Sequence, residues 1–210
     1  MNATRRRLLA AALGVPLAYI LNTRAEELTL ANGIFLIAKP ELLDPNFRET
    51  VLLITQPEAG SGPLGVIINR PLAARLSDVL PGIGTIPEVS QQIYSGGPVG
   101  QNRVLFLARS AQAPANSLRV LDEVYLTGDP QLPARIARGE LKVDEFRAYV
   151  DYAGWAPRQL QGEITAGGWY IAPADADIIF APEAFKVWPE MIKRATQRTT
   201  QRTSPSGLTG

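Results

Sequence analysis

The sequence predicts an α+β fold: a coiled, largely antiparallel β-sheet with several short peripheral helices. Apolar runs of strand length recur along the chain, and the first of them are joined by short connections, as antiparallel strands allow. The segments with helical character are short and end at proline or glycine. The 210 residues are 46% hydrophobic and 20% charged, which is a globular composition for a single domain.

The first three expected strands form a meander. Residues 34–38 are a continuous apolar run closed by Pro40, and residues 50–55 and 64–69 are rich in branched apolar side chains. Turn-forming residues at Asp44–Phe47 separate the first two strands. Because these runs are apolar throughout, we expect at least one of the strands to be buried on both faces.

The later strands include one whose side chains alternate. Between residues 146 and 152, apolar side chains alternate with Arg147, Tyr149 and Asp151, which is the period of a half-buried strand. The pattern also predicts strands at 103–107, 123–127 and 169–172, and helices at 75–80, 130–137, 156–166, 175–180 and 184–195, with Asp129 and Asp175 as N-caps.

Residues 1–25 have the features of a twin-arginine export signal. Arg5 and Arg6 follow Thr4, and an uncharged run of 14 residues begins at Leu8. This run is shorter than the roughly 20 apolar residues that span a bilayer, which favours a signal peptide over a stable membrane span. An uncleaved anchor or a wrongly assigned start codon is the alternative. The mature domain is then residues 26–195, and the polar residues 196–210 are expected to be disordered.

Charge and residue types exclude several functions. The net charge is +1, and the chain after residue 25 has 17 basic and 20 acidic residues, so no chain-wide charge favours nucleic acid. The chain has no histidine and no cysteine, which excludes Ser-His-Asp and Cys-His catalysis and zinc sites built on imidazole or thiolate. Only scattered carboxylates remain as strong metal ligands, so we expect no metal site and no cofactor.

The segment Ser95-Gly96-Gly97-Pro98 predicts a tight corner ahead of a hydrophobic strand. Adjacent glycines can adopt positive φ, and Pro98 keeps Gly97 out of the helical region. Such a backbone can aim successive N–H groups at an anion, but a corner between strands is the favoured interpretation. Ser95 as a nucleophile would need a lysine or a carboxylate as its base.

Several segments together resemble the YqgE/AlgH family of bacterial proteins, from Gly33 to about Arg194. The matching segments are Phe35–Pro40, Asp44–Phe47, Thr50-Val51, Gly65–Pro71, Ser95–Val99, Tyr152–Trp155, Gln159-Leu160, Trp169, Pro173–Asp175 and Phe180. The resemblance implies an α+β domain with a coiled, largely antiparallel sheet, and it brings no established activity. Where the family often has glycines, this chain has Asp151, Ala156 and Arg158, so positive φ is disfavoured there.

Most of the candidate ligand-binding residues lie next to expected strands, whereas Gln159 lies in the expected helix 156–166, and none is expected to be catalytic. Arg70 can bind carboxylate or phosphate, pair with Asp78 or cap a loop, and the two structural roles are favoured. For Trp155, core packing with its N–H bonded to a carbonyl is favoured over a groove for a partner. The full set is Asn69, Arg70, Ser95, Gly96, Gly97, Tyr152, Trp155 and Gln159.

These observations favour a non-enzymatic binding or accessory protein that acts after export, in the periplasm or outside the cell. Its expected partner is a protein or a small anionic ligand, and export would exclude binding to nucleic acid. One alternative is a hydrolase or transferase that uses carboxylates, Ser95 or a divalent metal. Another is a cytoplasmic regulator linked to exopolysaccharide gene expression, which the family resemblance suggests.

Overall fold

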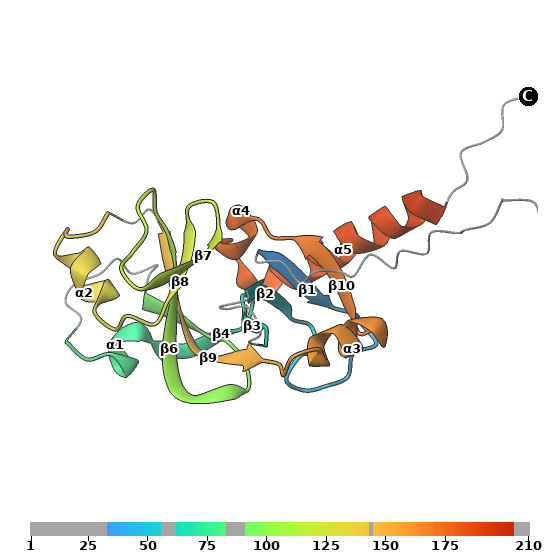
Figure 1. The fold of residues 1–210 in the computed structure, drawn as a ribbon, viewed down its shortest axis with the longest axis horizontal. Helices are drawn as coiled ribbons and strands as arrows, with labels where there is room; N and C mark the ends of the chain where they lie inside the picture. The colour runs from blue at the N-terminus through green and yellow to red at the C-terminus, as the bar shows by residue number, and fades with distance from the viewer. Residues whose placement is uncertain (1–32, 56–61, 83–90, 143–144, 204–210) are drawn as a thin grey trace, which may run out of the picture.

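A computed structural model describes residues 33–55, 62–82, 91–142 and 145–203, and these residues contain ten strands and five α-helices (Figure 1). The strands are β1 (Ile34–Ala38), β2 (Val51–Thr55), β3 (Leu64–Ile67), β4 (Pro71–Arg75), β5 (Gln92–Ser95), β6 (Val99–Arg109), β7 (Ser117–Leu121), β8 (Val124–Thr127), β9 (Glu145–Gly154) and β10 (Trp169–Pro173). The helices are α1 (Leu76–Val79), α2 (Leu132–Ala137), α3 (Gln159–Thr165), α4 (Ala176–Ile179) and α5 (Ala184–Thr203). The predicted fold class is confirmed, whereas the predicted export signal lies outside the described residues.

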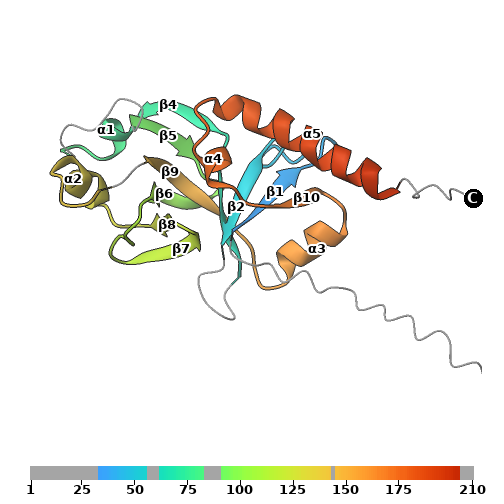
Figure 2. The ribbon, with the colours of Figure 1, turned by 90° about the horizontal axis from the view of Figure 1, so that it is seen from above.

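One curled sheet contains all of these strands. Its main path runs β10-β1-β2-β3-β9-β6-β8-β7, and β4 and β5 form a branch in which β5 pairs with β9. Every pairing is antiparallel except that of β5 with β9. Helices α1 and α2 lie at one end of the molecule, while α5 runs along the β1–β10 half and ends at the opposite extreme (Figure 2).

The sheet forks along β9. One edge of β9 pairs with β6 over most of its length. The other edge pairs first with β5, through Ala148–Val150, and then with β3, through Ala153 and Gly154. The residues between these two pairings, Asp151 and Tyr152, therefore lie at the branch point.

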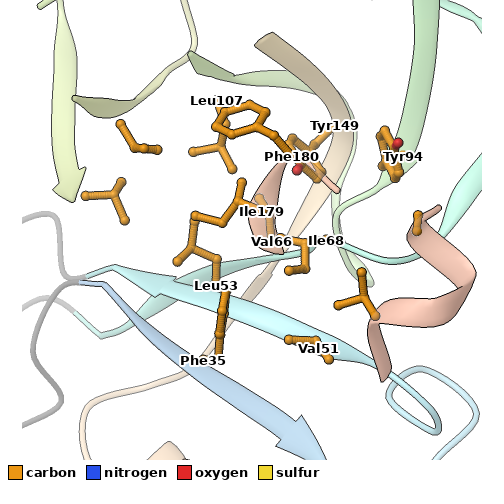
Figure 3. Packing of buried hydrophobic residues seen from close by; sticks show 14 of the residues in the cluster. Phe35, Val51, Leu53, Val66, Ile68, Tyr94, Leu107, Tyr149, Ile179 and Phe180 are labelled. Atoms are coloured by element: carbon orange, nitrogen blue, oxygen red, sulfur yellow. The ribbon is translucent and has the colours of Figure 1, made fainter. Parts of the chain in front are cut away.

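Three hydrophobic clusters pack on the faces of the sheet. The central cluster lies between its two halves and is covered by α4 and α5 (Figure 3). A second cluster packs on α1 and α2, and a third lies beneath α3. Alternate residues of one strand enter different clusters: Phe35 and Ile37 of β1 join the central cluster, while Leu36 and Ala38 join the third. The expected meander of β1, β2 and β3 is therefore present, and every residue of β2 is buried.

The alternation in residues 146–152 led to a wrong prediction. Both faces of β9 are covered, because the face carrying Arg147 and Tyr149 meets the central cluster and the other face meets α2. Arg147 is only 8% exposed and Tyr149 is fully buried. The alternation does not mark solvent exposure here, because the polar side chains of Arg147 and Tyr149 are buried as well as apolar ones.

Other differences concern elements with weak local patterns. β4, β5 and β7 are not predicted from the sequence, and most side chains of β4 are exposed. Asp129 is not the N-cap of α2, which is Gln131. Asp175 does cap α4, by accepting hydrogen bonds from the N–H groups of Asp177 and Ile178. Helix α5 continues to Thr203, into the segment for which the sequence predicts disorder.

Among the described residues, no helix has both the length and the apolar character needed to cross a membrane.

Candidate functional site

Seven of the eight predicted site residues lie in three segments that the fold brings side by side. Asn69 and Arg70 follow β3, the corner is formed by the end of β5 and the two glycines after it, and Tyr152 and Trp155 lie at the end of β9 and directly after it. The eighth, Gln159, is the first residue of α3. The Ser95 N–H donates to the Arg70 carbonyl at 2.9 Å. The corner in turn lies directly against the backbone of β9.

Asn69 fixes the connection between β1 and β2. Its Oδ1 accepts a hydrogen bond from the Val51 N–H at 2.8 Å, and its Nδ2 donates to the Glu49 carbonyl at 2.9 Å. Glu49 has a φ of 57°, a conformation that non-glycine residues rarely adopt. The Asn69 amide therefore holds a turn whose backbone conformation is strained.

Arg70 holds the same connection from its other side. It donates from Nη1 to the Asn46 carbonyl at 2.8 Å and from Nη2 to the Arg48 carbonyl at 3.4 Å. Burial, and then the charge of Arg48, lowers the pKa of Arg70. Of the two structural roles predicted for Arg70, the structure shows loop capping. Pairing with Asp78 is wrong, because the Asp78 carboxylate accepts the Arg75 N–H instead.

The glycine corner packs against β9 where the sheet forks. The Gly96 N–H donates to the Val150 carbonyl at 2.8 Å, so it belongs to the strand ladder and is not directed with the Ser95 N–H at one point. A Cβ on Gly96 would lie less than 3.0 Å from the Asp151 carbonyl oxygen, and a Cβ on Gly97 would be equally close to β9. Gly97 has the predicted positive φ, 154°, whereas Gly96 does not. The glycines are thus required mainly by close backbone approach.

Trp155 and Gln159 both bind Glu163, which sequence reasoning missed. Trp155 Nε1 donates to Glu163 Oε2 at 3.1 Å, and Gln159 Nε2 donates to Oε1 at 3.2 Å. Trp155 is 6% exposed and belongs to the third cluster. The core role predicted for Trp155 is what the structure shows, but its N–H is bonded to a carboxylate and not to a carbonyl. The spacing of Gln159 and Glu163, four residues apart in a helix, could have indicated the contact.

Phe47 packs against two tryptophans, Trp155 and Trp169. Its ring stacks on Trp155 at a centroid distance of 5.9 Å and meets the edge of Trp169 at 5.7 Å. Residues 41–49, here named the 41–49 loop, are therefore anchored by aromatic packing on one side and by Asn69 and Arg70 on the other. Leu43 in this loop is 82% exposed.

Tyr152 is half-buried at the fork and faces Arg103. The Arg103 guanidinium lies 5.9 Å from the Tyr152 ring centroid, and the Arg103 N–H donates to the Asp151 carboxylate at 3.2 Å. Asp151 and Arg158 have φ of 64° and 67°. The expectation that losing the family's glycines disfavours positive φ at these positions is therefore wrong, and both residues adopt it.

The buried position of Arg147, beside Tyr94 and Tyr149, was not predicted from the sequence. Arg147 donates from Nη1 to the Ile68 carbonyl at 3.4 Å and from Nη2 to the Ala181 carbonyl. Its guanidinium lies 4.7 Å from the Tyr94 ring centroid. Burial raises the pKa of Tyr94 and of Tyr149, and the Arg147 charge opposes the shift for both.

No group of three or more potential histidine, cysteine or carboxylate ligands occurs within the parts of the chain that the structure describes. Asp177, one of the acidic residues near the C-terminus, pairs with Arg109 at 2.9 Å. Arg109 also pairs with Glu145 at 3.2 Å.

Comparison with known proteins identifies the relatives of this chain. The sequence profile of a family described as AlgH-like matches residues 35–200. A UPF0301 protein of Chlorobium luteolum is 34% identical over 165 residues, covering 78% of this chain and 85% of the relative. A UPF0301 protein of Thermobifida fusca is 34% identical over 175 residues, covering 77% of this chain and 85% of that protein.

Two solved structures share the fold. A crystal structure of a Corynebacterium diphtheriae protein aligns with a TM-score of 0.65 and 28% identity, covering 78% of this chain and 86% of the other. The solution structure of the AlgH protein from Pseudomonas aeruginosa aligns with a TM-score of 0.63 and 27% identity, covering 84% of this chain and 95% of the other. The chain therefore belongs to the YqgE/AlgH family, whose members also carry the designation UPF0301.

Proposed function

We propose that this protein is a non-enzymatic binding or accessory protein that acts after export and docks on a protein partner through the 41–49 loop. The observation that carries the proposal is the way this loop is held. Asn69 and Arg70 bind its backbone, and Phe47 packs between Trp155 and Trp169. Two of the predicted ligand-binding side chains, Asn69 and Arg70, thus hold the backbone of a surface loop.

A loop held in this way is suited to recognition. Binding that must first order a flexible loop loses affinity, and a loop fixed in advance avoids that loss. Leu43 is the most exposed large hydrophobic side chain among the described residues, so it is available for apolar contact with a partner. An exposed apolar side chain on a rigid support fits a protein partner better than a small anion.

Site-specific crosslinking tests the docking surface. A photoreactive amino acid at position 43, in the full chain expressed in its host, is expected to yield a discrete crosslinked protein. Position 113, in the exposed connection between β6 and β7, is the matched control and should yield none. Adding Arg70→Met should reduce the position 43 product several-fold, because two contacts to the loop backbone are removed. Equal products at positions 43 and 113, or none at 43, contradict docking through this loop.

Export rests on Arg5, Arg6 and the short apolar run that follows them. Replacing both arginines by lysine should leave the precursor in the cytoplasm, while the unchanged chain is found outside it. Fractionation that finds the unchanged protein in the cytoplasm with its N-terminus intact contradicts export and favours a cytoplasmic role.

A further inference from the structure

We propose that Arg147 and Tyr149 form a buried binding site for one small monovalent anion, of the size of chloride or nitrate. The two residues are two positions apart on β9, so their side chains leave the strand on the same face. That face meets the central hydrophobic cluster, where Arg147 is 8% exposed and Tyr149 is fully buried. The inference is independent of the function proposed above.

The charge of Arg147 is the first argument. Its hydrogen bonds go to the carbonyls of Ile68 and Ala181, and its guanidinium faces the ring of Tyr94. These partners are dipoles and a ring, and none carries a negative charge. Among the described residues, no carboxylate lies within 4.0 Å of Arg147. A buried cation without an opposite charge is strongly unfavourable, and a bound anion would compensate it.

The hydroxyl of Tyr149 is the second, independent argument. It is the only buried side-chain polar atom without a hydrogen-bond partner in the parts of the chain that the structure describes. Figure 3 shows the Tyr149 ring beside Tyr94 and Phe180 in the central cluster. The Arg147 guanidinium lies near enough to the Tyr149 hydroxyl for its charge to lower the pKa of that group against the effect of burial, but the contact does not have hydrogen-bond geometry. An anion there would accept both the Tyr149 O–H and an Arg147 N–H.

The surroundings select the class of anion. One guanidinium balances one negative charge, and a divalent anion would leave a new charge buried. The cluster around the two residues is apolar, which favours a small anion with a weak hydration shell. The proposed ligand is therefore monovalent and small.

Bromide can locate the site directly. Crystals of the protein grown or soaked in sodium bromide should show an anomalous peak within hydrogen-bond distance of both the Tyr149 hydroxyl and the Arg147 guanidinium. Crystals of the Tyr149→Phe variant should lack that peak. Bromide found only at the surface of the unchanged protein overturns the proposal.

Thermal unfolding provides the test in solution. At constant ionic strength, replacing sodium gluconate by sodium chloride should raise the unfolding midpoint of the unchanged protein by about 5 °C. Tyr149→Phe removes only a hydroxyl without a partner, so the variant should fold and lose most of this chloride response. Tyr125→Phe, a half-buried tyrosine on β8, is the matched control and should keep it. An equal chloride response in the two variants overturns the proposal, as does no response in the unchanged protein.

Discussion

Alanine substitutions at four glycines, two at the fork and two elsewhere, should separate the effects of steric clash and of backbone strain on stability. At Gly96 a Cβ would lie less than 3.0 Å from the Asp151 carbonyl oxygen, while φ is not positive. At Gly139 nothing lies within 4 Å, but φ is +71°. Gly97 combines a close backbone neighbour with a φ of +154°, and Gly128 has neither, its Cβ position being 3.6 Å from the nearest side chain.

The expected losses follow from these two terms. Gly139→Ala places an alanine in the left-handed region and should destabilise by about 1–2 kcal/mol. Gly96→Ala should destabilise by about 3 kcal/mol, because the obstacle is a backbone carbonyl that cannot rotate away. Gly97→Ala adds both effects and should lose about 4 kcal/mol or more. Gly128→Ala should be neutral or stabilising by about 0.5 kcal/mol, since it restricts the unfolded chain.

Urea unfolding of the purified variants gives these free energies, with the slope checked for each variant. For the same reason Gly97→Val should lose far more than Ser95→Ala, which removes a hydroxyl from a half-buried residue and should lose less than about 1 kcal/mol. If Gly97→Ala lost no more than Gly139→Ala, the corner would not be held against β9 as described. Similar small losses for Gly97→Val and Ser95→Ala would lead to the same conclusion.

Three further predictions address backbone strain, pH and metals. Arg158 is exposed and has a φ of 67°, so Arg158→Gly should stabilise the protein by about 0.5–1 kcal/mol in urea unfolding, and a loss would show that this conformation is not strained. Burial raises the pKa of Tyr94 and Tyr149, so the stability from their neutral forms is present below the unfolded pKa of 10.0 and is lost as pH rises above it. In a spectrophotometric titration these two of the six tyrosines should ionise only when the chain unfolds, and ionisation of all six in the folded protein would contradict their burial. Elemental analysis after dialysis against chelator should find no stoichiometric transition metal, because the chain has no histidine or cysteine, and such a metal would restore the enzyme hypothesis.

The elements predicted from the sequence are those that a local residue pattern determines. β1, β2 and β3 were predicted from continuous apolar runs of strand length, and they are strands covered on both faces, with every residue buried except Ile34 and Leu64. β4 was missed because it is mostly exposed and lacks an apolar period. The contacts of Phe47 with Trp155 and Trp169 were missed because they join residues more than a hundred positions apart. For the same reason the sequence could not show that α4 and α5 cover the face that carries Arg147.

The fork in β9 explains the unusual backbone conformations of Gly97 and Asp151. Where β9 changes its partner along one edge, another segment of the same chain must approach its backbone closely. Gly96 and Gly97 are the residues of that segment. On the other edge, the pairing of β6 with β9 shifts register between Val99 and Val104, opposite Asp151. Asp151 adopts its positive φ at this irregularity, and its carboxylate accepts the Arg103 N–H of the bulged strand. Strained residues often mark binding sites, but here the strain follows from the branching of the sheet itself. Binding is therefore better sought at the 41–49 loop and at Arg147, where the structure leaves an exposed apolar side chain and a buried charge.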